Sequence, residues 1–292
     1  MIVAPYRDAV VLQEFFDALA EAGLTPHEPS QLLAALGDGQ LVRFRVSGDK
    51  AGSRNGWAVL YMLPSPAGAF GSWRTGQHVT WSMRPAAGET AAQRAQRRRN
   101  LDELHARWQA ERQRVQAEAA GRAGRLWAAA RPATDDHPYL RRKGVHAYGL
   151  RRLRDALLIP ARDAEGKLHT LQFIDAAGQK RFLSGGRIAG CYCSIGLPGA
   201  RVYVCEGIAT GATVHAVTGA AVAVAFSSGN LLPVAVALRQ KLPARTRIVI
   251  AADNDLHTPG NPGVTAAYAA ARAVGGLVAV PDLAALTGGP TA

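Results

Sequence analysis

The sequence predicts an α/β fold built on a parallel sheet. Three short apolar runs, at residues 202–205, 220–226 and 248–252, have the β-branched composition of buried strands and lack polar alternation. A helix-like stretch at residues 208–217 separates the first two runs. Because parallel strands need a crossover connection, this order of strand, helix and strand indicates a parallel sheet with helices on its faces.

Acidic residues follow two of these strands directly. Glu206 comes after the first run, and Asp253 and Asp255 come after the third. Functional groups collect beyond the carboxyl ends of parallel strands, so the three carboxylates are expected at one sheet edge. Carboxylates that converge in this way repel one another unless a cation lies between them, and oxygen ligands suit Mg²⁺ or Mn²⁺. A turn or helix cap would explain the Asp-x-Asp alone, but it does not explain the Glu-Gly after another strand.

The bulk composition indicates a globular protein with a polyanionic partner. The 292 residues are 48% hydrophobic and 19% charged, with a net charge of +12. Such a basic excess favours nucleic acid first and an anionic membrane surface second. A GC-rich genome is the plainer explanation. It accounts for the preference for arginine over lysine better than for the excess of basic over acidic residues.

The cysteines and the N-terminus indicate a cytoplasmic protein. Cys191 and Cys193 are too close for a zinc-ribbon pair, and Cys205 is the one further cysteine, so we expect free thiols in a reducing compartment. The N-terminus lacks the order of a signal peptide, and no apolar run approaches ~20 residues, so no membrane span is expected.

The pattern of Glu206-Gly207 after one strand and Asp253-x-Asp255 after a later one resembles the Toprim domain of bacterial-type primases, topoisomerases and some nucleases. The resemblance to Toprim primases of plasmids and phages extends upstream, through residues 137–144, 157–167, 171–174 and 180–186, and covers about half the chain. It implies a Rossmann-like parallel sheet of about four strands. It also implies a DNA primase of a mobile element, related to the chromosomal primases of bacteria, that makes short RNA primers on single-stranded DNA from nucleoside triphosphates.

The resemblance assigns roles to the acidic residues. Asp253 and Asp255 are expected to be the principal ligands of Mg²⁺ or Mn²⁺, because one residue between them lets both reach the same ion. Glu206 is expected to be a further ligand or a general acid/base. A helix at residues 262–274, started by Asn261-Pro262, and a last strand at 277–280 are expected to complete the sheet. Asp282, after that strand, is a further candidate ligand.

The resemblance also assigns the basic residues of the segment before the sheet to a groove for template and nucleotide. These residues are Arg141, Arg142, Lys143, Arg162, Lys180 and Arg181. A candidate phosphate-binding loop, Ser227-Ser228-Gly229-Asn230, follows the second strand and precedes a helix. Serine and asparagine are also common helix caps, so that alternative stays open.

The sequence departs from the chromosomal primases in ways that keep two other functions open. Thr210 stands where they carry an acid, and the chain has neither a zinc ribbon nor a nucleotide-binding Gly-Lys-Ser/Thr loop. A helicase would therefore be a separate partner. The alternatives are a Toprim nuclease and a non-catalytic accessory protein that binds single-stranded DNA during replication.

The chain is expected to form four segments. These are an N-terminal α+β module at 1–87, a long charged connector helix at 88–134, a β-rich basic lead-in at 135–199 and the Toprim domain at 200–292. In the module we expect strands at 41–46, 57–63 and 78–83, with a glycine-rich segment before the last. Its mixture of Lys50, Arg54, Trp73 and Arg74 either holds a single strand or is a small core with solvated cations, and the core is favoured.

Overall fold

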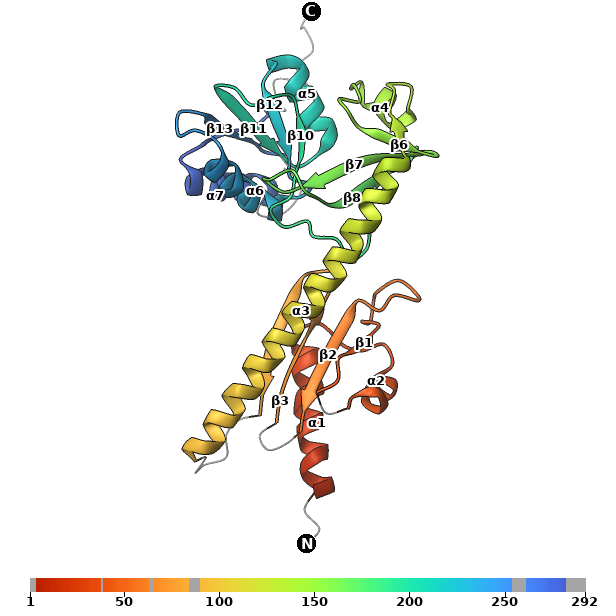
Figure 1. Ribbon diagram of the computed structural model, residues 1–292, viewed down its shortest axis with the longest axis vertical. Helices are drawn as coiled ribbons and strands as arrows, with labels where there is room; N and C mark the ends of the chain where they lie inside the picture. Colours follow the sequence, from red (N-terminus) through yellow and green to blue (C-terminus); the bar gives the residue numbers. More distant parts are fainter. Residues whose placement is uncertain (1–3, 38, 63–65, 84–89, 254–260, 282–292) are drawn as a thin grey trace, which may run out of the picture. The chain divides into compact units, whose positions relative to one another are not determined.

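The computed structural model describes residues 4–37, 39–62, 66–83, 90–253 and 261–281 (Figure 1). The chain divides into two compact units, Met1–Gln113 and Arg114–Ala292. The long helix α3 (Ala91–Ala129) contributes its first half to one unit and its second half to the other.

The N-terminal unit contains a four-stranded antiparallel sheet in the order β1–β2–β3–β4. Its strands are β1 (Val42–Phe44), β2 (Gly56–Tyr61), β3 (Ala67–Ser72) and β4 (Gln77–Ser82), and α1 (Ala4–Glu21) and α2 (Pro29–Ala35) are its helices besides the first half of α3. Phe15 of α1 contacts Phe70 and Trp81 edge to face on one side of the sheet. On the other side, Trp57 packs against Trp108 of α3, with ring centroids 6.0 Å apart. The tryptophan at 57 is thus a core residue, as the favoured interpretation expects.

Strand β3 is a difference from the sequence-based expectation, which left residues 68–76 outside the strands. All six residues of β3 are buried, and two of them are glycines that bring neighbouring groups close. A Cβ atom on Gly68 would lie 2.6 Å from the Phe15 ring, and one on Gly71 would lie 2.1 Å from the Gln77 carbonyl oxygen. Glycine has low strand propensity, so the tight packing that requires it also hides the strand from sequence analysis.

The second unit contains the predicted parallel sheet. Strands β12 (Ala221–Val224), β11 (Arg201–Cys205), β13 (Arg247–Ala251) and β14 (Leu277–Ala279) run parallel in that order, and β10 (Cys193–Ile195) adds an antiparallel edge beside β12. The four parallel strands and the helix after the first of them agree with the prediction. The antiparallel edge strand was not predicted.

Helices cover both faces of this sheet (Figure 1). Alternate residues of the strands pack against α6 (Leu231–Lys241) and α7 (Pro262–Val274) on one face. The remaining residues, including Cys205 and Val224, pack against α5 (Ile208–Thr218) on the other face. A strand buried on both faces needs apolar residues throughout, which explains the continuous apolar runs in the sequence.

The basic lead-in forms a second, antiparallel sheet in the order β5–β6–β7–β8–β9. Its elements are β5 (Arg131–Pro132), β6 (Arg151–Leu153), β7 (Ala156–Arg162), β8 (Leu168–Ile174) and β9 (Lys180–Phe182), with helix α4 (Pro138–Lys143) between β5 and β6. Leu157, Ile159 and Ile174 join the α5 side of the parallel sheet in one apolar cluster. Leu158 and Leu171, on the opposite face, pack against the second half of α3.

None of the helices in the described part of the chain combines the length and the apolar character needed to cross a bilayer.

The close packing around β3 gives a test of the N-terminal unit. Gly71→Ala should lower the free energy of unfolding by about 2 kcal/mol or more, because its Cβ would overlap the Gln77 carbonyl and the Trp57 ring. Gly124→Ala is the matched control, since Gly124 is helical and a Cβ there meets no atom within 4 Å. The control should raise stability by about 0.5–1 kcal/mol. Chemical denaturation of both variants measures the difference, and equal stability of the two would contradict this packing.

Candidate active site

The strand register brings two of the predicted acids to the same edge of the parallel sheet. Cys205 at the end of β11 lies opposite Ala251 at the end of β13. Glu206 follows directly after β11, and Asp253 follows two residues after β13. Both carboxylates therefore leave the sheet at the carboxyl ends of adjacent strands, which is where open parallel sheets hold their ligands.

The first turn of α7 fixes this pair at close quarters. Gly263 is buried at the start of the helix, and a Cβ built on it would lie 2.5 Å from the Asp253 carbonyl oxygen and 3.3 Å from Glu206 Oε1. Only glycine allows the helix to approach both acidic residues this closely. The amino end of a helix also favours negative charge beside it. Asn261-Pro262 predicts the start of this helix, but no sequence pattern indicates a role for the glycine that follows.

The two acidic residues affect the pKa of the Cys205 thiol. Burial raises its pKa, and the negative charges of Asp253 and Glu206 raise it further. Burial also raises the pKa of the Cys193 thiol, to about 12. A thiol binds metal as its thiolate, so these protonated sulfur atoms are weaker candidate metal ligands than the carboxylates of this edge.

The donor atoms of the described residues at this edge are of the type that hard divalent cations prefer. Glu206 and Asp253 offer carboxylate oxygens, which Mg²⁺ and Mn²⁺ prefer. Within the described ranges no group of three histidine, cysteine, aspartate or glutamate side chains is placed to hold a metal. The other two predicted ligands, Asp255 and Asp282, lie outside the described residues.

A strained aromatic residue lies beside Glu206. Phe226, just after β12, has a positive φ of 73°, which is rare for a bulky side chain. Its amide donates a hydrogen bond to the Glu206 carbonyl oxygen at 2.9 Å, and its ring meets Phe182 of β9 edge to face at 5.4 Å. Phe226 therefore joins the acidic edge to the lead-in sheet, a connection that no sequence pattern indicated.

The structure separates three of the cations predicted for the groove, Arg162, Lys180 and Arg181. Lys180 pairs across the strands with Ile174, so it lies on the face of the lead-in sheet that meets the parallel sheet. Arg181 pairs with Phe173 and lies over its ring at 5.0 Å, on the face that packs against α3. Arg162 is on that same side, 5.8 Å from the ring of Trp127 in α3. Adjacent strand residues point to opposite faces, so the side chains of Lys180 and Arg181 leave the sheet on opposite sides.

The cations of α4 are exposed at the end of that helix. Arg141, Arg142 and Lys143 form its last turn, which favours positive charge. Arg142 donates a hydrogen bond to the Ala176 carbonyl oxygen at 3.0 Å and so holds the turn between β8 and β9. Arg142 thus supports the strand that carries Lys180.

The candidate phosphate loop forms η1 (Ser228–Asn230) at the same edge as the acids, just before α6. Asn230 is buried, and both the oxygen and the nitrogen of its side-chain amide form hydrogen bonds within the protein. Asn230 accepts a hydrogen bond from the Gly190 amide and donates to the carbonyl oxygens of Ile188, Cys191 and Ala225. Asn230 therefore connects segments of the fold, whereas Ser227 and Gly229 are exposed.

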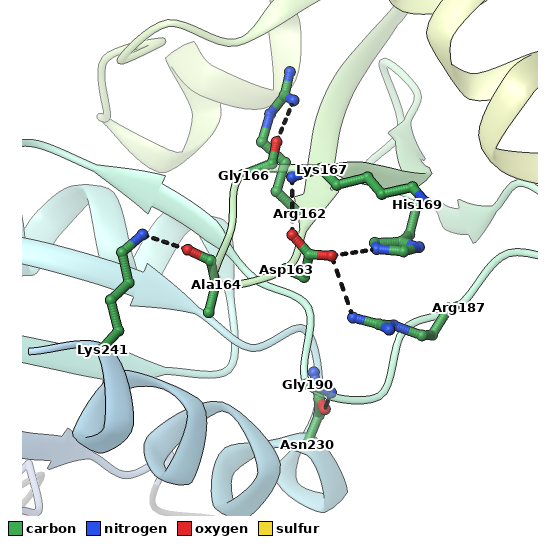
Figure 2. A network of polar contacts seen from close by, with 10 residues as sticks. All are labelled: Arg162, Asp163, Ala164, Gly166, Lys167, His169, Arg187, Gly190, Asn230 and Lys241. Carbon is green, nitrogen blue, oxygen red and sulfur yellow. Dashed lines mark hydrogen bonds and ion pairs between the residues drawn. The ribbon is translucent and has the colours of Figure 1, made fainter.

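A separate polar network surrounds the turn between β7 and β8 (Figure 2). Asp163 accepts hydrogen bonds from the Lys167 amide at 2.8 Å and from His169 Nε2 at 2.6 Å, and Arg187 lies 3.6 Å away. Burial raises the pKa of the Asp163 carboxyl, but these three partners outweigh it and hold the pKa below its usual range. Lys241 of α6 donates to the Ala164 carbonyl oxygen and fastens the same turn.

Comparison with known proteins agrees with the sequence-based resemblance. Residues 201–283 match the family model of the Toprim domain. Two proteins of Escherichia coli called DNA primase TraC are 36% and 39% identical to the chain over 284 and 286 residues, in each case 93% of this chain. The chain spans 20% of the length of the first and 26% of the second. The segment that follows the lead-in is thus a Toprim domain, and the resemblance to Toprim primases of plasmid type is confirmed.

Two solved structures are also similar to part of the chain. One is the primase fragment of the bacteriophage T7 primase-helicase protein, with a TM-score of 0.37 and 13% identity over 52% of this chain and 65% of that one. The other contains T7 primase domains with lagging-strand polymerase and an RNA/DNA hybrid, with a TM-score of 0.37 and 14% identity over 52% of this chain and 79% of that one.

The Asp163 network predicts a pH-dependent contribution to stability. Asp163→Asn should lower the free energy of unfolding by about 1–3 kcal/mol at neutral pH. The folded-state pKa lies below the unfolded value of about 3.9, so the carboxylate's contribution is complete above that value and is lost as pH falls through the folded pKa. Urea unfolding should therefore show a constant difference from the wild type at neutral pH that shrinks in acid.

Asp175→Asn is the control for this effect. Asp175 occupies the same place in the next turn and accepts a hydrogen bond from the Gln179 amide at 2.9 Å. In the described part of the chain it forms no ion pair with a histidine or arginine. The two variants should differ in their acid dependence, and superimposable curves would contradict the role of His169 and Arg187.

Proposed function

We propose that this chain is the catalytic part of a DNA primase of a plasmid, phage or other mobile element, which joins ribonucleotides into short primers on single-stranded DNA. The observation that carries the proposal is the meeting of Glu206 and Asp253 at the carboxyl edge of the Toprim sheet, beside the start of α7. The similarity to DNA primase TraC over nearly the whole chain supports primer synthesis over the other activities of Toprim proteins.

The site would use Mg²⁺ or Mn²⁺. We assign Glu206, Asp253 and Asp255 as its ligands, with Asp282 as a further ligand. When bound, such ions favour deprotonation of the primer 3′-hydroxyl and neutralise charge on the phosphate. The chain's part is to hold the carboxylates together, and Gly263 and the close approach of α7 support that role.

The cations of the lead-in would bind the substrates. We propose that Lys180 contacts the phosphates of an incoming nucleoside triphosphate, because its sheet face meets the Toprim domain. Arg162 and Arg181, on the other face, would bind the template strand together with exposed Arg141 and Lys143. Ser227, Ser228 and Gly229 are candidates for backbone contacts to phosphate, while Asn230 keeps their loop in shape.

We assign a separate role to each segment of the chain. The lead-in at 135–199 and the Toprim domain at 200–292 would carry catalysis, the connector at 88–134 would join them to the N-terminal module, and the module at 1–87 would bind the template. A separate replicative helicase is a candidate partner. The location would be the cytoplasm, where template and nucleotides are present.

Substitution of the acids tests the assignment. Asp253→Asn and Glu206→Gln should each reduce primer synthesis at least about a hundredfold, since each removes a charge on which metal binding depends. The assay supplies single-stranded DNA, labelled ribonucleotides and Mg²⁺ or Mn²⁺, and resolves the products by length. Asp155→Asn is the control, because its side chain is 92% exposed and lies outside the proposed site.

The same assay separates the alternative functions. Shortening of the DNA without incorporation of nucleotides would show a nuclease, and binding without any product would show an accessory protein. Full activity of Asp253→Asn would overturn the site.

A further inference from the structure

The N-terminal unit contains a pocket with a concentration of arginine side chains. The pocket has a volume of about 510 Å³ and lies between α2, β1 and the loop before β2. Arg43 and Arg45 line it from β1 and its continuation, and Arg54 lines it from the loop, together with Gly52 and Ser53. All of these residues belong to the first compact unit. We call this feature the arginine pocket.

Backbone carbonyl groups hold the three guanidinium groups in place. Arg43 Nε donates to the Arg54 carbonyl oxygen at 3.1 Å, and Arg54 Nη2 donates to the Arg43 carbonyl oxygen at 3.0 Å. Arg45 donates through Nε and Nη2 to the Asp49 carbonyl oxygen at 3.1 and 2.9 Å. Each guanidinium has five N–H donors, so every one of the three keeps several free for a ligand. The donors are therefore ordered before a ligand binds, and the arginine side chains lose less conformational entropy on binding.

The charge of the arginine pocket is not balanced by nearby acids. Among the described residues, no carboxylate forms an ion pair with Arg43, Arg45 or Arg54. Asp49, the acid of the adjacent loop, is directed elsewhere: it pairs with Arg74 at 2.9 Å and accepts a hydrogen bond from Asn55 at 3.2 Å. Glu28 is the one carboxylate among the lining residues. Three guanidinium groups against one carboxylate leave a positive site that an anion would stabilise.

We propose that the arginine pocket binds the phosphate groups of a nucleotide or of a single nucleic-acid strand. Planar guanidinium groups match phosphate geometry in a bidentate manner, and the volume is in the range of small-ligand sites. The net charge of +12 favours polyanionic ligands for the whole chain. The proposal extends the proposed primase function, because it gives the template a second contact in the N-terminal unit.

The tryptophan side chains of this unit do not line the pocket, and Phe44, which does line it, is only 7% exposed. Trp57 is 1% exposed, and Trp73 and Trp108 pack against it. Bases therefore have no stacking surface in this cluster, and binding to the pocket should depend on phosphate and little on base identity. Arg54 stands among the cations near the tryptophans in the sequence, whereas Arg43 and Arg45 alternate with apolar residues in the predicted strand at 41–46, a pattern typical of a solvated face.

The first experiment places a single negative charge in the pocket. Gly52 lines it with a φ of 75°, and a Cβ there meets no atom within 4 Å. Aspartate and asparagine tolerate this left-handed conformation best, so Gly52→Asp and Gly52→Asn differ in charge but little in shape. Fluorescence anisotropy of labelled oligothymidylate with the full chain should show binding weakened about tenfold by Gly52→Asp and nearly unchanged by Gly52→Asn. Equal affinities of the two variants would overturn the proposal.

The second experiment removes positive charge. Arg43→Gln with Arg54→Gln takes two exposed cations from the pocket, and Arg201→Gln with Arg245→Gln takes two exposed cations from the second unit. For single strands the slope of log affinity against log salt changes by about 0.7 for each phosphate contact. The pocket pair should therefore reduce the slope by about 1.4 relative to the control pair. The same slope in both pairs would contradict phosphate contact at the pocket.

Two probes distinguish the sources of phosphate. Labelled ATP and labelled oligothymidylate are titrated separately against the Gly52 variants. Loss of strand binding alone identifies a template contact, loss of ATP binding alone identifies a nucleotide site, and no loss with either probe refutes the proposal. Each titration is repeated in the Asp253→Asn background, where binding is measured without primer synthesis. A failure of the proposed primase activity is thereby kept apart from a failure of the pocket.

Discussion

The parallel pairing of β11 with β13 is the constraint on which the candidate active site depends. Five residue pairs, from Arg201 with Arg247 to Cys205 with Ala251, fix the register. A shift of one strand by one residue would send its side chains to the opposite face, so Val204 and Ile250 could no longer pack in the same apolar cluster. The packing of the strands in the core therefore determines that Glu206 and Asp253, which follow β11 and β13, lie at the same edge of the sheet.

Much of this unit could be predicted because its signals are local. Buried parallel strands carry unbroken apolar runs, and Asn261-Pro262 starts α7 at the predicted residue. The acids that end β11 and β13 were recognisable for the same reason. What could not be predicted depends on contacts between distant segments. The positive φ of Phe226 and the closeness of Gly263 to Glu206 arise from packing, for which one sequence has no pattern.

The positions of the basic side chains also could not be predicted from the sequence. The sequence identified a run of cations in the lead-in, but strand register decides which ligand each can reach. Lys180 and Arg181 are neighbours in the chain and lie on opposite faces of a sheet. In the N-terminal unit, β3 escaped prediction because its glycines allow close packing while lowering strand propensity. Arg43 and Arg45 looked like ordinary surface residues until the loop that faces them was known.

The buried amide of Asn230 has a consequence for how the second unit unfolds. Its hydrogen bonds reach the segment around Gly190 and Cys191 as well as the end of β12. One apolar cluster likewise combines Ile159 and Ile174 of the lead-in with Val222 and Val224 of the Toprim sheet. Neither sheet can open without exposing the apolar surface of the other. Heat or denaturant should therefore melt the two sheets in a single cooperative transition.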